Sequence, residues 1–202
     1  ILVPKINSAA EVETASKLMD KAGAKAEMQL WAMMETPVAM LQAQSIAASA
    51  VNTRMTAWVM GTNDIAKELR CAHTPERLPM MTPLGLCLLA ARAYGLVILD
   101  GVYNDIKDEA GFAAMCEQGR DLGFDGKTLI HPSQVEPCNR IFSPDPMEVE
   151  FSRLVINAFK LPENAGKGVL KVEGRMVELL HAEIAERVVA VADAIAELEA
   201  TG

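Results

Sequence analysis

The stretch MQLWAMMETP, residues 28 to 37, joins an apolar run to an abrupt polar end. A continuous apolar run of this kind is typical of a strand that is buried on both faces, as in parallel sheets. One acid, Glu35, closes the run, and Thr36-Pro37 breaks the pattern before a helical segment. The stretch therefore predicts a buried parallel strand that is followed by a helix.

The same strand-then-helix unit recurs along residues 1–142. The expected strands lie in ILVPKI, MQLWAMM, TAWVMG, GLVILDG and GKTLIHP. The expected helices cover residues 9–22, 38–51, a segment beginning near 64, then 83–94, 109–122 and 133–142. Five units fit an open doubly wound sheet or part of a (β/α)8 barrel. No GxGxxG or GxxxxGKS/T loop is present, which favours an incomplete barrel, and the chain begins inside an expected strand.

The pattern changes after residue 142. Asp145 is placed to cap a helix that runs to about Phe159, and PENAGKGVLKVEG predicts a linker. Apolar residues at helical spacing then predict a second helix over residues 176–198. We therefore expect a partial barrel lacking its first strands over residues 1–143, and a C-terminal helical extension over 144–202 that packs on a neighbouring subunit.

Composition excludes several classes of function. The net charge of -8 offers no basic surface for nucleic acid and disfavours an anionic membrane. The most apolar stretch, PLGLCLLAARAYGLVIL, is interrupted by Arg92 and predicts no membrane span. The four cysteines form no CxxC pair, which indicates free thiols and a cytoplasmic location. No HExxH or GxSxG motif is present, so neither a zinc site nor a serine nucleophile elbow is expected.

Ionisable residues follow all five expected strands, where parallel α/β folds bind their ligands. They are Lys5, Glu35, Asp64, Asp100 and His131. Glu35 and Asp64, from neighbouring strands, would suit a hard cation such as Mg²⁺; the alternative is that both merely cap the helices that follow. Asp100 fits a turn as well as a site, and Lys5 would form a structural ion pair with a strand-end acid as readily as a catalytic one.

Several motifs together resemble one family. They are METP, GTNDIAKEL, AARAYGLVILDGVYNDIKDEAGF, GFDGKTLIHPSQ, FSP and GRMVELLH, which keep their order along nearly the whole chain. The sequence resembles the citrate lyase beta-subunit-like CoA ester lyases of the HpcH/HpaI aldolase superfamily, which include malyl-CoA and citramalyl-CoA lyases. The resemblance implies a TIM (β/α)8 barrel of the phosphoenolpyruvate/pyruvate type, with the five units here as its last five. It also implies that Glu35 and Asp64 bind Mg²⁺, with Mn²⁺ as a substitute.

The resemblance further implies roles for single residues. Substrate or CoA contacts fall to Thr62, Asn63, Asp100, Ile130, His131 and Pro132, with Lys5 in support. Glu178 in GRMVE matches a tail carboxylate that acts in a neighbouring subunit, although the family pattern GKMID has Asp at this position. The other possibility for Glu178 is a surface position on an amphipathic helix. The catalytic arginine of the family should lie in the part that is absent here.

The activity implied by the resemblance is Mg²⁺-dependent carbon-carbon cleavage, or formation, of a short 3-hydroxyacyl-CoA. Malyl-CoA would give acetyl-CoA and glyoxylate, and other substrates of this class would give propionyl-CoA or another 2-oxo acid such as pyruvate. Two alternatives stay open: a malyl-CoA thioesterase that uses the same metal site, and a citrate lyase beta-type subunit that needs an acyl-carrier partner. By the same resemblance, we expect a homotrimer or a hexamer.

Overall fold

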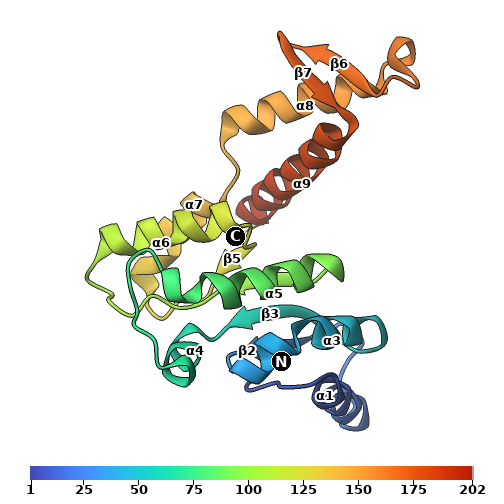
Figure 1. The fold of residues 1–202 in the computed structure, drawn as a ribbon. Helices are drawn as coiled ribbons and strands as arrows, with labels where there is room; N and C mark the ends of the chain where they lie inside the picture. The colour runs from blue at the N-terminus through green and yellow to red at the C-terminus, as the bar shows by residue number, and fades with distance from the viewer. Residues whose placement is uncertain (202) are drawn as a thin grey trace. The chain divides into compact units, whose positions relative to one another are not determined.

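The computed structural model describes residues 1–201, which fall into two compact units. The first unit runs from Ile1 to Phe142, and the second begins at Ser143 and is drawn in orange and red in Figure 1. Among the described residues, no helix is long and apolar enough to cross a membrane. Each unit has its own hydrophobic core, so the two are described separately.

The first unit alternates strands and helices throughout (Figure 1). The strands are β1 (Leu2–Val3), β2 (Leu30–Met34), β3 (Met55–Met60), β4 (Val97–Asp100) and β5 (Gly126–Lys127). The α-helices are α1 (Ala9–Lys21), α2 (Pro37–Leu41), α3 (Ala43–Ala48), α4 (Thr62–Leu69), α5 (Met81–Ala93), α6 (Glu109–Leu122) and α7 (Val135–Phe142). Short 3-10 turns are η1 (Ser49–Asn52), η2 (Leu78–Met80) and η3 (Pro132–Gln134).

All five strands are parallel, and their order in the sheet is β1-β2-β3-β4-β5, the same as in the sequence. A doubly wound sheet reverses its strand order at a switch point, whereas a (β/α)8 barrel adds each strand beside the previous one. The sequential order therefore identifies the barrel type of the two folds that the sequence left open.

The two faces of the sheet differ in burial. In β2, Leu30, Ala32 and Met34 are fully buried against the helices, whereas Trp31 and Met33 on the opposite face are only half-buried. Successive side chains of a strand point to opposite faces, so the second set lies on the inner side of a barrel-type sheet. This alternation decides which strand-end residues reach the inner side.

The structure differs from the sequence prediction at several places in this unit. The first strand covers only Leu2–Val3, so Lys5 lies beyond its end, and the helix expected over residues 133–142 begins as η3 before α7. The helix expected over residues 38–51 is broken at Gln42 into α2 and α3 and ends as η1. The fifth strand is only two residues long and stops at Lys127, so His131 does not end a strand but precedes η3.

The second unit contains two helices and a β-hairpin: α8 (Pro146–Lys160), β6 (Val169–Val172), β7 (Arg175–Glu178) and α9 (Leu179–Thr201), with the 3-10 turn η4 (Pro162–Asn164). Asp145 caps α8 as predicted. The hairpin differs from the sequence prediction, which has a linker over residues 162–174 and a helix over residues 176–198. Glu173 and Gly174 both have positive φ, which suits the tight turn of a two-residue hairpin.

Candidate functional site

Glu35 and Asp64 lie at the carboxyl ends of the adjacent strands β2 and β3. Met34 is in register with Met60, and Gly61 N donates to Met34 O at 2.9 Å. Glu35 directly follows Met34 and continues the inner set of side chains, whereas Asp64 lies in the first turn of α4. The strand register therefore brings the two predicted acids to one edge of the sheet.

Glu35 does not cap the helix that follows it. Thr36 is the N-cap of α2, and its hydroxyl accepts from Ala39 N at 3.1 Å, while Pro37 occupies the first turn. The Glu35 side chain is instead buried, with 4% of the residue exposed, and its Oε1 accepts from Lys5 N at 2.8 Å. The structure thus removes the capping alternative for Glu35. For Asp64, a first-turn position remains favourable to the helix dipole by itself.

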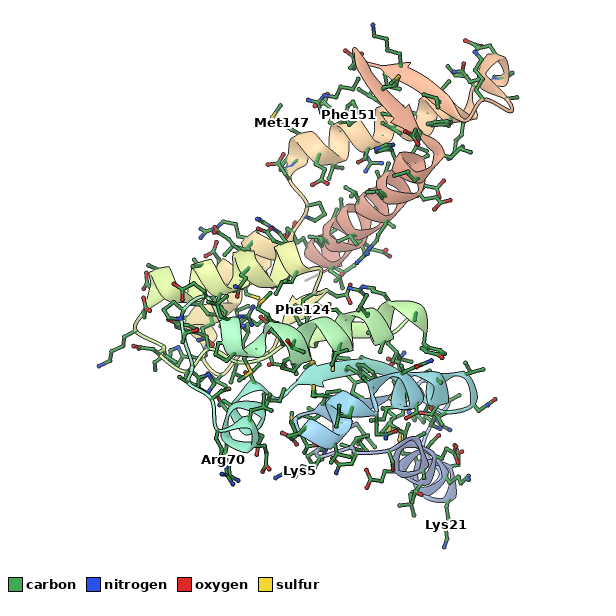
Figure 2. The ribbon with its side chains drawn as sticks, in the orientation of Figure 1. Lys5, Lys21, Arg70, Phe124, Met147 and Phe151 are labelled. Carbon is green, nitrogen blue, oxygen red and sulfur yellow. The ribbon has the colours of Figure 1, made fainter. Side chains whose placement is uncertain are left out.

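Lys5 links the end of β1 to both acids. Its backbone amide donates to Glu35, as described above, and its Nζ lies 3.6 Å from Asp64 Oδ1. Figure 2 shows Lys5 at the same edge of the unit as Arg70, which ends α4. The predicted ion pair between Lys5 and a strand-end acid is therefore present, but 59% of the Lys5 side chain is exposed. An exposed pair of this kind contributes about 0–1 kcal/mol to stability.

The electrostatics of the pair suit a cation. Burial raises the pKa of Glu35, the Lys5 amide lowers it, and the negative charge of Asp64 raises it again. A buried carboxylate beside a second negative charge forms a donor set for a hard cation, and Mg²⁺ typically takes one or two carboxylates and completes its shell with water and substrate. Among residues 1–201, no group of three or more His, Cys, Asp or Glu side chains is placed to hold a metal. Glu35 and Asp64 together fit Mg²⁺.

The raised pKa of Glu35 predicts a pH dependence. Protons and metal compete for the same oxygens, so Mg²⁺ affinity should fall as the pH drops, with a midpoint above 4.5, the ordinary value for glutamate. Because the folded state takes up this proton more readily than the unfolded state, the metal-free protein gains stability as the pH falls through the raised pKa. Calorimetric Mg²⁺ titrations at decreasing pH would measure the midpoint. A midpoint at or below the ordinary value, or an identical curve for Glu35→Gln, would contradict the prediction.

Gly61 provides the space for Glu35. A Cβ at Gly61 would lie 2.7 Å from Glu35 Oε2 and closer still to Glu35 Cβ. We predict that Gly61→Ala displaces the carboxylate, weakens Mg²⁺ binding, and costs about 1–3 kcal/mol of stability as an overpacked site. Gly85→Ala is the matched control: Gly85 lies within α5, a Cβ there would meet nothing within 4 Å, and the change should stabilise by about 0.5–1 kcal/mol. Equal Mg²⁺ affinity in the two variants, measured calorimetrically, would refute the prediction.

A cavity of about 310 Å³ lies at the start of α4, the helix that carries Asp64. It is formed by Thr62 at the start of α4, by the loop of residues 73–77 and by the loop of residues 102–108. Asn63 Nδ2 donates to Asn104 Oδ1 at 3.1 Å, and Asn104 Nδ2 donates back to Asn63 Oδ1 at 2.8 Å. Of the predicted residues, Thr62 therefore lines the cavity and Asn63 contacts it through Asn104, a lining residue that no sequence pattern indicates.

The loop of residues 102–108 is held by its own polar contacts. Tyr103 donates through its hydroxyl to Asp108 Oδ2 at 2.5 Å, which raises the pKa of Tyr103 to about 12 and lowers that of Asp108. Asp108 also caps α6 by accepting from Gly111 N at 2.9 Å. Gln134 donates to Tyr103 O at 3.1 Å. These contacts give the cavity a fixed wall.

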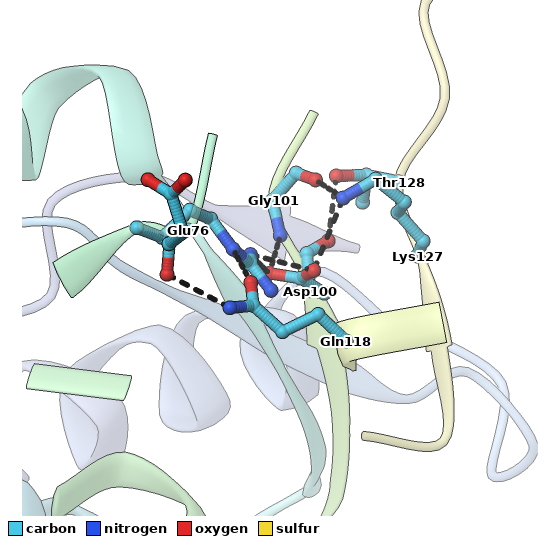
Figure 3. A network of polar contacts seen from close by, with 7 residues as sticks. Glu76, Asp100, Gly101, Gln118, Lys127 and Thr128 are labelled. Atoms are coloured by element: carbon cyan, nitrogen blue, oxygen red, sulfur yellow. Dashed lines mark hydrogen bonds and ion pairs between the residues drawn. The ribbon is translucent and has the colours of Figure 1, made fainter. Parts of the chain in front are cut away.

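Asp100 points away from the inner side of the sheet. It shares the face of the buried Ile98, and its fully buried carboxylate contacts Arg77 and Lys127 (Figure 3). Its predicted role as a substrate contact therefore stays a prediction without geometric support. No local sequence pattern indicates a role for Arg77 or Lys127. The register of β4 and β5 pairs Asp100 with Lys127, which places the two side chains on the same face of the sheet.

The remaining predicted residues lie outside this cluster. Ile130 is 52% exposed, and His131 acts as a cap whose Nδ1 accepts from Ser133 N at 3.2 Å before Pro132 begins η3. Glu178 belongs to the second unit, where it is exposed at the end of β7 and its amide donates to His181 Nδ1 at 2.9 Å. The roles predicted for these residues in CoA binding and proton transfer stay predictions.

This chain is similar to several known proteins. The profile of the HpcH/HpaI aldolase/citrate lyase family matches residues 1–132. A (3S)-malyl-CoA thioesterase of Cereibacter sphaeroides is 52% identical over 201 residues, which are 100% of this chain and 67% of the relative. The chain belongs to the HpcH/HpaI aldolase/citrate lyase family. This confirms the resemblance drawn from METP, GTNDIAKEL and the later motifs.

Other members of the family are more distant. The citrate lyase subunit beta of Escherichia coli is 33% identical over 149 residues, covering 74% of this chain and 49% of the relative. The crystal structure of protein CitE from Mycobacterium tuberculosis in complex with magnesium, acetoacetate and coenzyme A matches with a TM-score of 0.70 and 27% identity, covering 94% of this chain and 67% of that one. The chain thus spans about two thirds or less of the length of these proteins.

Proposed function

We propose that this chain is part of a Mg²⁺-dependent enzyme that acts on a short 3-hydroxyacyl-CoA of the malyl-CoA type and hydrolyses its thioester. The observation that carries the proposal is the buried Glu35 beside Asp64 at the carboxyl ends of β2 and β3. The magnesium and coenzyme A bound by the mycobacterial relative support the choice of metal and of substrate class. Mn²⁺, another oxygen-preferring divalent cation, is proposed as a substitute.

The residues of this chain would perform four tasks. Glu35 and Asp64 would hold Mg²⁺, which when bound polarises oxygen atoms of the substrate and stabilises developing negative charge. Thr62 and Asn104 would line the cavity that receives the hydroxyacyl group, and Asn63 would hold Asn104 in place. Lys5 would keep the acids in place through its amide and its ammonium group. Glu178, from a neighbouring copy in a homotrimer or hexamer, is proposed to transfer a proton.

We prefer thioester hydrolysis to carbon-carbon cleavage because the thioesterase is more similar in sequence to this chain than the citrate lyase subunit is. The thioesterase is 52% identical across the whole chain, whereas the citrate lyase beta subunit is 33% identical across 74% of it. In hydrolysis, water adds to the thioester carbonyl, the carbon-sulfur bond breaks, and the thiol leaves with a proton. In the second candidate reaction, the lyase cleavage implied by the sequence resemblance, the bond between the hydroxyl-bearing carbon and the next carbon breaks instead.

Product analysis of the full-length enzyme tests the proposal. With (3S)-malyl-CoA and Mg²⁺, we expect malate and free CoA thiol in equal amounts, and no turnover after chelation of the metal. Acetyl-CoA with glyoxylate would overturn the hydrolase in favour of the lyase. Turnover that appears only after addition of an acyl-carrier protein would overturn both and favour a citrate lyase beta-type subunit.

A further inference from the structure

A buried ionic cluster joins four segments of the first unit (Figure 3). Arg77 Nη1 donates to Asp100 Oδ1 at 2.7 Å and to Asp100 Oδ2 at 2.8 Å, and Lys127 Nζ lies 3.1 Å from Asp100 Oδ2. Gln118 on α6 accepts from Arg77 Nε at 2.6 Å and donates to Glu76 O at 2.8 Å. The cluster thus connects the loop before η2, the end of β4, β5 and α6.

Stability alone is a poor explanation for this cluster. It places two cations against one carboxylate, with side-chain exposures of 7% for Arg77 and 0% for Asp100 and Lys127. Burial and the charge of Arg77 lower the pKa of Lys127, although Asp100 opposes them. Arg77 Nη2 is buried and has no hydrogen-bond partner among the described residues. Apolar residues of similar size are often as stable as a buried ion cluster or more so.

The cluster lies in direct contact with the substrate cavity. Arg77 itself lines the cavity, as does Thr62. Asp100 Oδ1 accepts from the amide of the next residue, Gly101, at 2.8 Å, and Lys127 Nζ donates to Gly101 O. A Cβ at Gly101 would lie 2.7 Å from Thr62 Cγ2 and 2.8 Å from Met60 O, so this turn packs tightly against the start of α4. Contacts therefore run from Arg77 through Asp100 and Gly101 to Thr62.

We propose that Arg77 is a positioning residue, which acts through Asp100 to fix the Gly101 turn against Thr62. By fixing the Gly101 turn, Arg77 holds the first turn of α4, which carries Asp64, in place. It also holds the part of the cavity wall where Asn63 contacts Asn104. The proposal rests on the proposed function in one respect, namely that substrate occupies this cavity. Misplacement of about 1 Å at a reacting centre can cost on the order of 10²-fold in rate, so a distant anchor has a measurable effect.

The test compares Arg77→Met with Arg92→Met in the full-length enzyme. Arg92 also forms a paired contact with an aspartate, at 2.9 Å to each oxygen of Asp125, but at the opposite ends of β4 and β5, where conserved contacts of barrels serve stability. We expect Arg77→Met to lower kcat/KM by on the order of 10²-fold, largely through kcat. Arg77→Lys should recover part of this loss, and Arg92→Met should leave kcat/KM within about twofold while lowering Tm.

Amide hydrogen exchange gives a readout that does not depend on turnover. Arg77→Met should speed exchange in residues 61–66 and 101–104, whereas Arg92→Met should speed it around residues 95–98 and 123–126. Similar exchange in both variants, or a folded Arg77→Met with kcat/KM within threefold of wild type, would overturn the proposal. If Arg77→Met does not fold, Gln118→Met removes the acceptor of Arg77 Nε and leaves the charges in place.

Different results would contradict the proposed function and the positioning role of Arg77. A wild-type enzyme that turns over no CoA ester defeats the proposed function, and the exchange data still decide the role of Arg77. An active wild type whose Arg77→Met variant behaves like Arg92→Met defeats the positioning role alone.

Discussion

Substitution of Glu35 by glutamine should lower Mg²⁺-dependent turnover of the CoA ester by at least about 10³-fold, which corresponds to about 4 kcal/mol of transition-state stabilisation. The amide keeps the shape of the side chain and its acceptor for the Lys5 amide, but it removes the negative charge that would hold the cation. The fold should survive, because burial already disfavours the charged form of Glu35 and raises its pKa. For the full-length variant, steady-state kinetics measures turnover, calorimetry measures Mg²⁺ affinity, and thermal unfolding measures stability.

Glu68→Gln is the appropriate control for this substitution. Glu68 lies on α4 like Asp64, but its side chain is 44% exposed and pairs with Lys67 at 3.9 Å. Turnover and Mg²⁺ affinity should both stay within about twofold, since an exposed pair of this kind contributes little. If Glu35→Gln retained turnover within tenfold of wild type, the assignment of the metal to Glu35 and Asp64 would be wrong.

The features that the sequence predicted well depend on local patterns. Apolar runs and helical spacing located all five strands of the first unit, and α6 over residues 109–122 was predicted with the bounds that the structure has. Glu35 and Asp64 could be paired because parallel strands of one sheet end at one edge. The same pattern also predicted that Lys5 would meet a strand-end acid, and the structure has this contact.

The features that the sequence did not predict depend largely on contacts between segments that are distant in the sequence. Arg77 lies in the polar loop CAHTPERLPM, where a charged residue is ordinarily exposed, and nothing near it in sequence indicates a partner 23 residues away. Asp100 followed by glycine suggested a turn, and only the burial alternation of β4 shows that its side chain faces the helices. The hairpin of the second unit was not predicted. Its strands LKV and RMV, on either side of Glu173-Gly174, are short and lie beside many turn-forming residues, so their alternation is typical of a linker as much as of strands.

Removal of the Asp100 carboxylate should produce a large loss of stability. Asp100→Ala would leave Arg77 and Lys127 buried beside each other without their shared anion, and breaking a buried ion pair on one side typically costs about 3–5 kcal/mol. Asp121→Ala is the control, because the Asp121 side chain is 68% exposed and its pair with Arg120 should contribute under about 1 kcal/mol. Urea unfolding of both variants in the full-length protein measures the difference, and equal midpoints would refute the prediction.

A triple variant separates the stability of the cluster from its role in positioning. Arg77→Met, Asp100→Leu and Lys127→Met together remove every charge of the cluster, so most of the stability lost in Asp100→Ala should return, since apolar replacements of buried ion clusters are often neutral or better. The kinetics should not return with it, because no group would then hold the Gly101 turn against Thr62 through the Arg77–Asp100 contact. A triple variant with wild-type stability and wild-type kcat/KM would show that the cluster serves packing alone.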